Sequence, residues 1–448
     1  MNHPTLTARR RVSAALAAFG LLLGALAAPR LSAAETSVVL PPAADLPVQT
    51  NLPDPLRLED GRKITTREQW ARHRGQMREI IEHYAIGHRP PPPGNVTGRV
   101  LESRILLDGK ARYQLVHLAF GPEGQLGFDA AIFTPIKTPV LEGSFPKLGA
   151  GERRLQAAEL ASRNGRFPTI VQPSFNYTPG VNLPPTSHPG SSMVFKPVAP
   201  EAAAADYAAT LARGYAVMTF YYQQCGADSR TNRASGFFPA YPGYDWGDLA
   251  AWAWSMSRCV DYLEQQPWVD KAKIIAVGHS RLGKATLIAG AFDERFALVA
   301  PAGSGCGGTG AYRFTGKGRG GKEGLDDVIH KFPQWFGPGL AEFSGRADQL
   351  PFDQHWLIDL VAPRVFIAPD GLDDGAANEN ALAHAWLAAK PVYALLGVPD
   401  HLGIHFRPGK HMLAPADWTA ILDFADQQLG GMKSDQRFDQ LPPLDQLH

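Results

Sequence analysis

A serine at the centre of a glycine-containing turn is the strongest chemical signal in the chain. The motif Gly278-His279-Ser280 follows the apolar run 274–277 and precedes the helix-compatible segment 284–292. The sequence therefore predicts a sharp strand-to-helix turn with the serine at its tip. Such a turn exposes the hydroxyl and places the next backbone N–H at a helix N-terminus, where it can hold an oxyanion. Ser280 is a candidate nucleophile, provided that a base reaches it.

The match to the G-x-S-x-G pattern of nucleophile elbows is incomplete. Leu282 stands where the second glycine is expected, and Gly283 comes one position later. The alternative interpretation is a plain strand–turn–helix connection in which Ser280 caps the helix, because serine is a favoured N-cap residue. The local pattern leaves both interpretations open.

Candidates for the base lie downstream, in the order that such a site requires. The partners of an elbow serine come from loops after later strands, with the acid before the histidine. His411 follows the predicted strand 403–407 and is the preferred base. His405 lies inside that strand and is expected to pack, and His401 is expected to be a surface loop residue.

Candidates for the acid follow the predicted strand 365–368. Asp373 and Asp374 both occupy a position from which a carboxylate can orient an imidazole and stabilise its cation. Asp373 is the preferred acid. The competing interpretation is that the run 370–375 only forms turns, since Asp and Gly dominate turns.

Two cationic residues stand beside the serine. The guanidinium of Arg281 would bring fixed positive charge and N–H donors to an oxyanion forming at Ser280. Lys284, one helical turn later, could face the same pocket and would favour an anionic or heavily hydroxylated substrate. The alternative for either side chain is an exposed charge on a helix.

The elements that must position these residues alternate between strand and helix. Expected strands are residues 98–106, 113–120, 127–134, 167–172, 216–222, 274–277, 296–301, 365–368 and 403–407. Expected helices are residues 66–84, 246–265 and 415–428, with an alanine-rich one that ends near Arg213. This pattern predicts an α/β-hydrolase fold in a single domain, 35–448. Its mostly parallel central sheet has antiparallel N-terminal edge strands and helices on both faces. Residues 137–165 are expected to form a surface insertion.

Residues 1–34 differ in character from the rest. Arginines at positions 9–11 precede the apolar stretch 12–28, and the small residues 32–34 follow, as in a secretory signal peptide. A transmembrane anchor is the alternative, but the stretch is short for a span of about 20 residues and is interrupted by glycine. We predict that 1–34 is removed and that the protein is periplasmic or extracellular, without membrane contact.

Composition narrows the possible partners. Apolar residues make up 44% of the chain and charged residues 19%, and the net charge is +1, which is typical of a globular protein with ample core. Nucleic acid is excluded as an expected partner, because no long basic run follows the N-terminus. Three cysteines leave at least one unpaired within the chain. No Cys/His grouping has the spacing of a metal site, so neither a metal nor another cofactor is predicted. The protein is expected to be a monomer.

Several blocks in the same order resemble the bacterial branch of the glucuronoyl esterases, carbohydrate esterase family 15, over roughly residues 52–430. The blocks are Gly278-His279-Ser280-Arg281-Leu282-Gly283-Lys284, Tyr244-Asp245-Trp246-Gly247, Ala251-Trp252-Ala253-Trp254-Ser255, Asp293-Glu294-Arg295-Phe296-Ala297, Ser304-Gly305-Cys306-Gly307-Gly308, Phe352-Asp353-Gln354-His355, Ala362-Pro363-Arg364 and His405-Phe406-Arg407-Pro408-Gly409-Lys410-His411. The resemblance implies a metal-free serine esterase that cleaves esters between glucuronic acid side chains of xylan and lignin alcohols.

The resemblance also implies roles for single residues. Ser280 would be the nucleophile, His411 the base and Arg281 the residue that stabilises the oxyanion, while Lys284 would contact the uronic acid hydroxyls. Many members carry the acid as a glutamate just before Ser-Gly-x-Gly-Gly, where this chain has Gly303. Others use an acid after the seventh strand, which here means Asp373 or its neighbour.

A second departure concerns the sugar platform. The family often has a tryptophan in the later acidic loop, where this chain reads Asp373-Asp374-Gly375-Ala376-Ala377, so that platform is expected to be absent. Two other functions therefore stay in competition. One is a carbohydrate esterase of another kind, such as a polysaccharide deacetylase, and the other is a degenerate hydrolase fold that only binds glycans.

Overall fold

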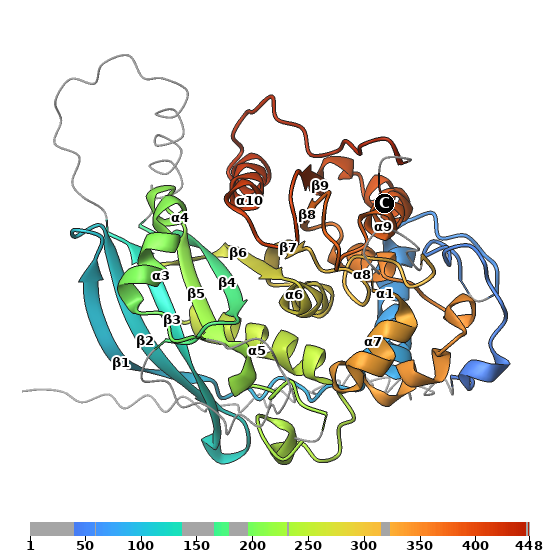
Figure 1. Ribbon diagram of the computed structural model, residues 1–448, viewed down its shortest axis with the longest axis horizontal. Helices are drawn as coiled ribbons and strands as arrows, with labels where there is room; N and C mark the ends of the chain where they lie inside the picture. Colours follow the sequence, from blue (N-terminus) through green and yellow to red (C-terminus); the bar gives the residue numbers. More distant parts are fainter. Residues whose placement is uncertain are drawn as a thin grey trace, which may run out of the picture. The chain divides into compact units, whose positions relative to one another are not determined.

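Nine strands of the described residues form one sheet (Figure 1). The structure is a computed structural model that describes residues 40–58, 60–136, 165–178, 196–230, 233–314, 323–444 and 447. The predicted signal peptide, 1–34, lies outside these ranges, as does all but the last residue of the predicted insertion 137–165. The described residues belong to one compact unit, Leu40–His448.

The N-terminal part of the sheet is antiparallel. β1 (Thr97–Leu106), β2 (Ala111–Phe120) and β3 (Leu126–Pro135) pair with one another in chain order. β3 then pairs antiparallel with β5 (Ala216–Tyr221), which joins this meander to the rest of the sheet. The predicted antiparallel edge strands are thus confirmed.

The remaining strands are parallel and carry the elements that matter for chemistry. In the order β1-β2-β3-β5-β4-β6-β7-β8-β9, all neighbours from β5 onward pair parallel. These strands are β4 (Phe167–Ser174), β6 (Val269–His279), β7 (Phe296–Ala302), β8 (Val365–Gly371) and β9 (Leu402–Arg407). Because parallel strands end at the same edge, the loops after β6, β8 and β9 meet there. The order and the connecting helices confirm the α/β-hydrolase class.

Helices cover both faces of this sheet (Figure 1). Along β6, Ile274 and Ala276 belong to the core cluster that includes α5, α6, α8 and α9 residues, whereas Ile275 and Val277 pack in the cluster that contains α10. This alternation follows from the two-residue period of a strand. The helices are α1 (Arg67–Ile81), α3 (Pro200–Asp206), α4 (Ala208–Ala212), α5 (Asp248–Leu263), α6 (Arg281–Phe292), α7 (Leu325–Lys331), α8 (His355–Val361), α9 (Glu379–Leu395) and α10 (Pro415–Gln428).

Helix ends agree with the sequence where capping signals are strong and differ where they are weak. Thr66 and Gln69 form a capping box at the start of α1, as the polar run before Trp70 indicates. The predicted helix 66–84 ends earlier as an α-helix and continues as a π-helical turn, Glu82–Ile86. α8 was not predicted from the sequence. All of its residues are buried, so it lacks an amphipathic pattern.

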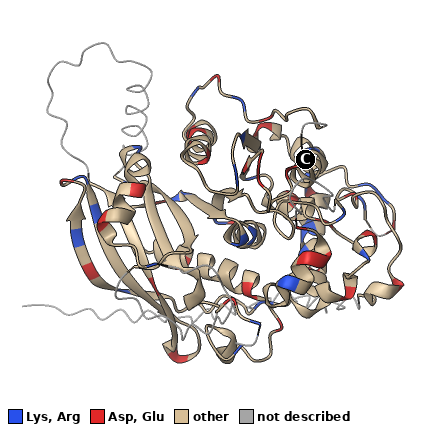
Figure 2. Ribbon diagram, in the orientation of Figure 1, with Lys and Arg blue, Asp and Glu red and all other residues tan. Residues whose placement is uncertain are grey.

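Charge and sulfur chemistry are unremarkable across the described chain. Lys and Arg are interspersed with Asp and Glu along the ribbon (Figure 2). No described helix combines the length and apolar character needed to cross a bilayer.

Cys225, Cys259 and Cys306 are all buried and free. No two of them form a disulfide, which answers the open question of their pairing.

Candidate active site

Ser280 stands at the predicted turn between β6 and α6. Its backbone has φ 59° and ψ −130°, a region that a non-glycine residue rarely occupies. Such strain persists only where the surroundings impose it, and it is common at functional sites. The serine side chain makes no capping hydrogen bond to α6. The interpretation of Ser280 as a mere helix cap is therefore wrong.

Two glycines let the strand and the helix approach each other around this serine. A Cβ at Gly278 would lie 2.2 Å from Thr286 Oγ1 and 2.4 Å from the Leu282 carbonyl oxygen. A Cβ at Gly283 would lie 2.9 Å from the Ala302 carbonyl oxygen. The close contact falls at Gly283 because Leu282 points into the core, where it is 1% exposed. This explains the shifted second glycine.

We expect Gly278→Ala to destabilise the protein. The added methyl would collide with the backbone of the first turn of α6, which cannot move without disturbing the elbow, so the free energy of unfolding should fall by about 3 kcal/mol. Gly75→Ala in α1 is the matched control, because a Cβ there meets nothing within 4 Å. Urea unfolding of both variants measures the difference. Equal stabilities would show that the elbow tolerates a side chain.

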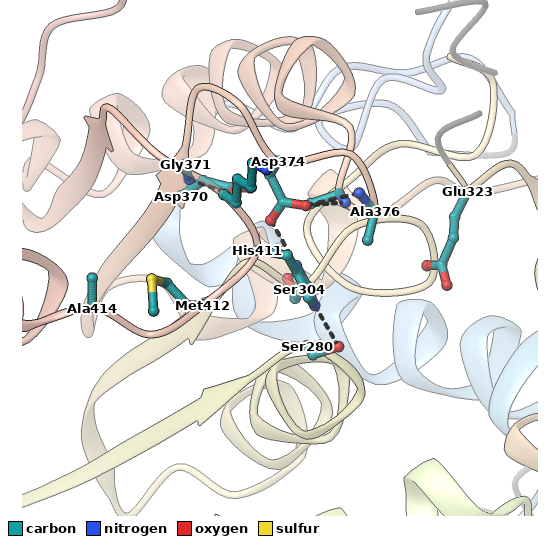
Figure 3. Close-up of polar contacts among 12 residues, drawn as sticks. Ser280, Ser304, Glu323, Asp370, Gly371, Asp374, Ala376, His411, Met412 and Ala414 are labelled. Atoms are coloured by element: carbon teal, nitrogen blue, oxygen red, sulfur yellow. Dashed lines mark hydrogen bonds and ion pairs between the residues drawn. The ribbon is translucent and has the colours of Figure 1, made fainter. Parts of the chain in front are cut away.

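His411 connects Ser280 to a carboxylate (Figure 3). His411 Nε2 lies 2.9 Å from Ser280 Oγ, and His411 Nδ1 lies 2.6 Å from Asp374 Oδ2. An ionised carboxylate only accepts hydrogen bonds, so Nδ1 carries the proton and Nε2 accepts from the serine hydroxyl. The three side chains come from the loops after β6, β8 and β9, and they have the geometry of a Ser-His-Asp triad.

The structure places Asp374 at the histidine, and the preferred acid, Asp373, does not contact His411. Asp373 Oδ2 instead accepts a hydrogen bond of 2.9 Å from the Gly409 backbone N–H, and the Asp373 N–H donates to the Gly409 carbonyl oxygen at 3.0 Å. Asp373 thereby ties the acid loop to the histidine loop. Asp374 is 2% exposed and turned inward by the bend at 371–374.

A buried arginine holds the loop that carries His411. Arg407, the last residue of β9, donates from Nε to Asp417 Oδ2 at 2.7 Å. Its guanidinium also donates to the carbonyl oxygens of Lys410 and Met412, on either side of the histidine. The Arg-Pro-Gly run of the sequence thus forms a fixed loop.

The environment keeps Asp374 ionised. Burial by itself would raise the pKa of Asp374, but the hydrogen bond from His411 and those from the backbone of Ala377 and Ala376 bring that pKa below its ordinary value. Burial raises the pKa of the nearby Asp370 well above its usual range, and the charge of Asp374 adds to the effect. Of these two neighbouring acids, only Asp374 is a charged acceptor.

His279 packs against the catalytic candidate from the other side. Its ring centroid lies 4.5 Å from that of His411, and its Nε2 is buried without a hydrogen-bond partner in the described part of the chain. Burial, reinforced by His411, lowers the pKa of His279 to about 3. His279 is therefore neutral wherever the site can work.

This depressed pKa predicts an acid-labile fold. Between pH 6.5 and about 3 the unfolded chain binds a proton at His279 that the folded chain does not, so stability falls as pH falls through this window. His279→Phe keeps a ring beside His411 and should remove up to about 1.4 kcal/mol per pH unit of this dependence. Urea unfolding at pH 7, 5 and 4 tests this. Parallel pH profiles for both proteins would contradict it.

Arg281 directly follows Ser280 and is paired with a buried carboxylate. Its Nη1 donates to Asp228 Oδ2, while its Nε is buried and has no hydrogen-bond partner among the described residues. Burial would lower the pKa of Arg281, but Asp228 and then Tyr222 outweigh burial and raise it. The guanidinium is thus a buried, permanent cation whose Nε–H has no acceptor among the described residues. It is not the exposed helix charge of the alternative interpretation.

Lys284 is buried in the first turn of α6 and lies beside two residues that the sequence did not reveal. Lys284 is 3% exposed, and its Nζ donates to the Ser304 carbonyl oxygen at 2.7 Å and to Glu323 Oε2 at 2.9 Å. The Trp335 ring centroid lies 5.7 Å from the same Nζ. Glu323 stands apart from the triad in Figure 3. A tryptophan is therefore present, supplied by a segment after β7 instead of the acidic loop.

At Gly303, where many family members carry the acid of the triad, this chain has little space for a side chain. Its acid comes from the loop after β8 instead. Gly303 has φ +49°, and a Cβ there would lie 3.2 Å from His279 Nε2 and 3.5 Å from Asp374 Oδ2. The space next to the histidine is already occupied by these two side chains. Within the described residues, no group of three or more His, Cys, Asp or Glu side chains is arranged to hold a metal ion.

Comparison with known proteins agrees with this geometry. Residues 172–397 match the family described as "Glucuronyl esterase, fungi". Carbohydrate esterase MZ0003, from an unknown prokaryotic organism, is 30% identical over 423 residues, which cover 87% of this chain and 91% of that protein. A 4-O-methyl-glucuronoyl methylesterase of Schizophyllum commune is 28% identical over 376 residues, covering 83% of this chain and 79% of its own length.

Solved structures give the same result. A glucuronoyl esterase from Solibacter usitatus superposes with a TM-score of 0.70 at 28% identity, covering 86% of this chain and 99% of that one. The family match includes the elbow at Ser280 and the loop that carries Asp374, and it ends before His411. The chain belongs to the glucuronyl esterase family of carboxylic ester hydrolases.

Proposed function

We propose that this protein hydrolyses esters of glucuronic or 4-O-methyl-glucuronic acid, as in linkages between glucuronoxylan and lignin, by a Ser-His-Asp acyl-enzyme mechanism. The observation that carries the proposal is the hydrogen-bonded series from Ser280 through His411 to Asp374, placed beside the cations Arg281 and Lys284. A nucleophile alone suits any ester. The two buried cations favour an acyl group that carries oxygen-rich substituents.

In the first half of the reaction, Ser280 Oγ attacks the ester carbonyl carbon while His411 Nε2 takes the hydroxyl proton. The carbonyl oxygen becomes an oxyanion, which the Arg281 guanidinium and backbone N–H groups stabilise. Asp374 holds the imidazole in position and stabilises its cation. When the tetrahedral intermediate collapses, the ester C–O bond breaks and the alcohol leaves with the proton from His411.

In the second half, water replaces the alcohol. His411 takes a proton from the water, whose oxygen attacks the acyl-enzyme carbonyl through a second oxyanion at Arg281. Collapse releases the uronic acid, and His411 returns the proton to Ser280. The degenerate, binding-only alternative is disfavoured because Ser280, His411 and Asp374 are joined by hydrogen bonds in the order that this cycle needs.

The substrate assignment draws on the relatives and on Lys284. The Schizophyllum commune protein and relatives from Phanerochaete carnosa and Hypocrea jecorina are named 4-O-methyl-glucuronoyl methylesterases. Lys284 with Glu323 offers a cation and a carboxylate to sugar hydroxyl groups, and the Trp335 ring borders them. We also propose that the protein acts outside the cytoplasm as a monomer, after removal of residues 1–34.

The test compares hydrolysis of benzyl glucuronate with that of a small acetyl ester. We expect a clear preference for the glucuronate ester. A preference for acetate would assign the protein to a different group of carbohydrate esterases, and turnover of neither ester would favour a glycan-binding module.

Lys284→Met should separate uronate recognition from esterase chemistry. Losing a charge-assisted hydrogen bond to the sugar should raise KM for benzyl glucuronate by about tenfold to a hundredfold, while acetyl ester kinetics stay the same. Lys331→Met is the matched control, because Lys331 pairs with Asp327 at 2.7 Å on an exposed helix face. An equal rise in KM for both esters would show that Lys284 does not recognise the uronate.

A further inference from the structure

One buried carboxylate, which neither motif nor triad includes, collects the hydrogen bonds of four side chains. Asp228 Oδ2 accepts from Arg281 Nη1 and from the Tyr222 hydroxyl at 3.0 Å. Asp228 Oδ1 accepts from Gln334 Nε2 at 3.1 Å and from Trp335 Nε1 at 2.7 Å. One oxygen therefore holds the arginine beside the nucleophile, and the other holds the segment that carries the tryptophan beside Lys284.

Burial makes these contacts strong. Asp228 is 3% exposed, and the Arg281 side chain is 14% exposed, so water does not compete effectively for either charge. The guanidinium carbon of Arg281 also lies 5.1 Å from the Trp335 ring centroid. In a dry environment the paired arginine is fixed in one orientation, with Nη1 occupied by Asp228 and Nε left without a partner.

The backbone at Asp228 is adapted to this task. Its φ is 54°, a value that most side chains avoid but that Asp and Asn tolerate. The strained turn directs the carboxylate inward from the loop after β5, between α6 and the 3-10 turn Pro333–Trp335. Its two oxygens thereby contact Arg281 on one side and Trp335 on the other.

We propose that Asp228 is a positioning residue that orients Arg281 toward the oxyanion and links it to the Trp335 side of the pocket. The proposal rests on the proposed function of Arg281. Asp228 itself does not touch the reacting atoms. Its carboxylate restricts the guanidinium to the rotamer in which the remaining N–H groups face the developing charge, and it holds the sugar-side wall at a fixed distance from that charge.

Asp228→Asn is the sharpest single substitution. Asparagine keeps the shape and tolerates the positive φ, and its one carbonyl oxygen can still accept from Trp335 and Gln334. Its NH₂ group then faces Arg281 Nη1, donor to donor, so the orientation of the guanidinium is lost. We expect kcat for benzyl glucuronate to fall about tenfold to a hundredfold, while KM changes less than about threefold.

Asp353→Asn is the matched control for a general effect on stability. Asp353 is also fully buried and paired with an arginine, Arg313 Nη1 at 2.9 Å, but it contacts neither Ser280 nor Arg281. This variant should lose stability and keep kcat. If the two variants lowered kcat alike, Asp228 would be a structural residue only.

A double-mutant cycle with Arg281→Ala tests the link itself. If Asp228 acts through Arg281, the loss of kcat in Arg281→Ala should not grow when Asp228→Asn is added. Guanidinium ion at non-denaturing concentration should partly restore Arg281→Ala, and at least tenfold less in the double variant, because Asp228 is the group that holds it. Additive losses with equal rescue would overturn the proposal.

The same experiment keeps the two proposals apart. If Arg281→Ala retained wild-type kcat, the oxyanion role of Arg281 would fail, and the role of Asp228 with it. If Arg281→Ala lost kcat but the cycle was additive, only the role of Asp228 would fail. Ser280→Ala, measured alongside, reports on the esterase mechanism independently of both.

Discussion

Ser280→Ala is expected to lower kcat for benzyl glucuronate by about 10⁵-fold or more, without weakening substrate binding. The side chain makes a single described hydrogen bond, to His411 Nε2 at 2.9 Å, and does not cap α6. Its removal therefore deletes the attacking atom and little else. Alanine also has a shorter side chain at a strained φ, so the fold should persist, and the variant should bind the uronic acid product as the wild type does.

The measurement is steady-state hydrolysis with calorimetric binding of glucuronic acid. Ser255→Ala is the matched control, because Ser255 is a buried serine whose Oγ donates to the Ala251 carbonyl oxygen at 2.8 Å. It should lose about 1 kcal/mol of stability and retain turnover. Residual activity of Ser280→Ala above about 1% of wild type would exclude Ser280 as the nucleophile.

Asp374→Asn and Asp373→Asn are expected to differ by about a thousandfold or more in kcat, although the two residues are adjacent. The Asp374 carboxylate accepts a hydrogen bond from His411 Nδ1–H. Asparagine in its place would favour the wrong tautomer and leave the imidazolium without a counter-charge, costing about 10⁴ in kcat. Asp373 only accepts from the Gly409 N–H, which an asparagine oxygen also does. Asp373→Asn should therefore stay near wild type.

Kinetics at constant pH, together with circular dichroism to verify folding, separate the two outcomes. Reversal of the order, with Asp373→Asn inactive, would mean that the loop rearranges when substrate binds. Combining Asp374→Asn with Ser280→Ala should give no further loss, because residues of a triad act as a unit. A further loss would indicate that Asp374 acts on turnover by a route other than His411.

The choice between Asp373 and Asp374 shows what a local pattern leaves open. Both acids follow the same strand, and both sit in an Asp/Gly-rich turn, so spacing from β8 does not separate them. The bend after Gly371 directs one carboxylate to the histidine and the other to Gly409. Which of the two adjacent carboxylates faces His411 depends on how this turn is oriented. The orientation is set by contacts with the loop at Gly409, over thirty residues away in sequence.

The roles of Asp228, Glu323 and Trp335 could not be predicted from the sequence, for a related reason. Each stands in an irregular segment with no periodicity, and each gains its role from a partner on α6, the helix that begins after Ser280. The positive φ at Asp228 is a property of the folded loop, for which Asp is permissive but not diagnostic. α8 was missed because all seven of its residues are buried, so it lacks the amphipathic period, and α9 was missed although only one of its faces is buried.

From the sequence alone we predicted the alternation of strands and helices, the elbow at Ser280, and His411, Arg281 and Lys284 as its companions. These are local properties: apolar periods, glycines that a close contact requires, and side chains whose chemistry is tied to a position next to a strand end. The tertiary structure alone decided which acid meets His411, which carboxylate holds Arg281, and where the tryptophan comes from. Those depend on distances between loops that only the packing of the parallel strands brings to one edge.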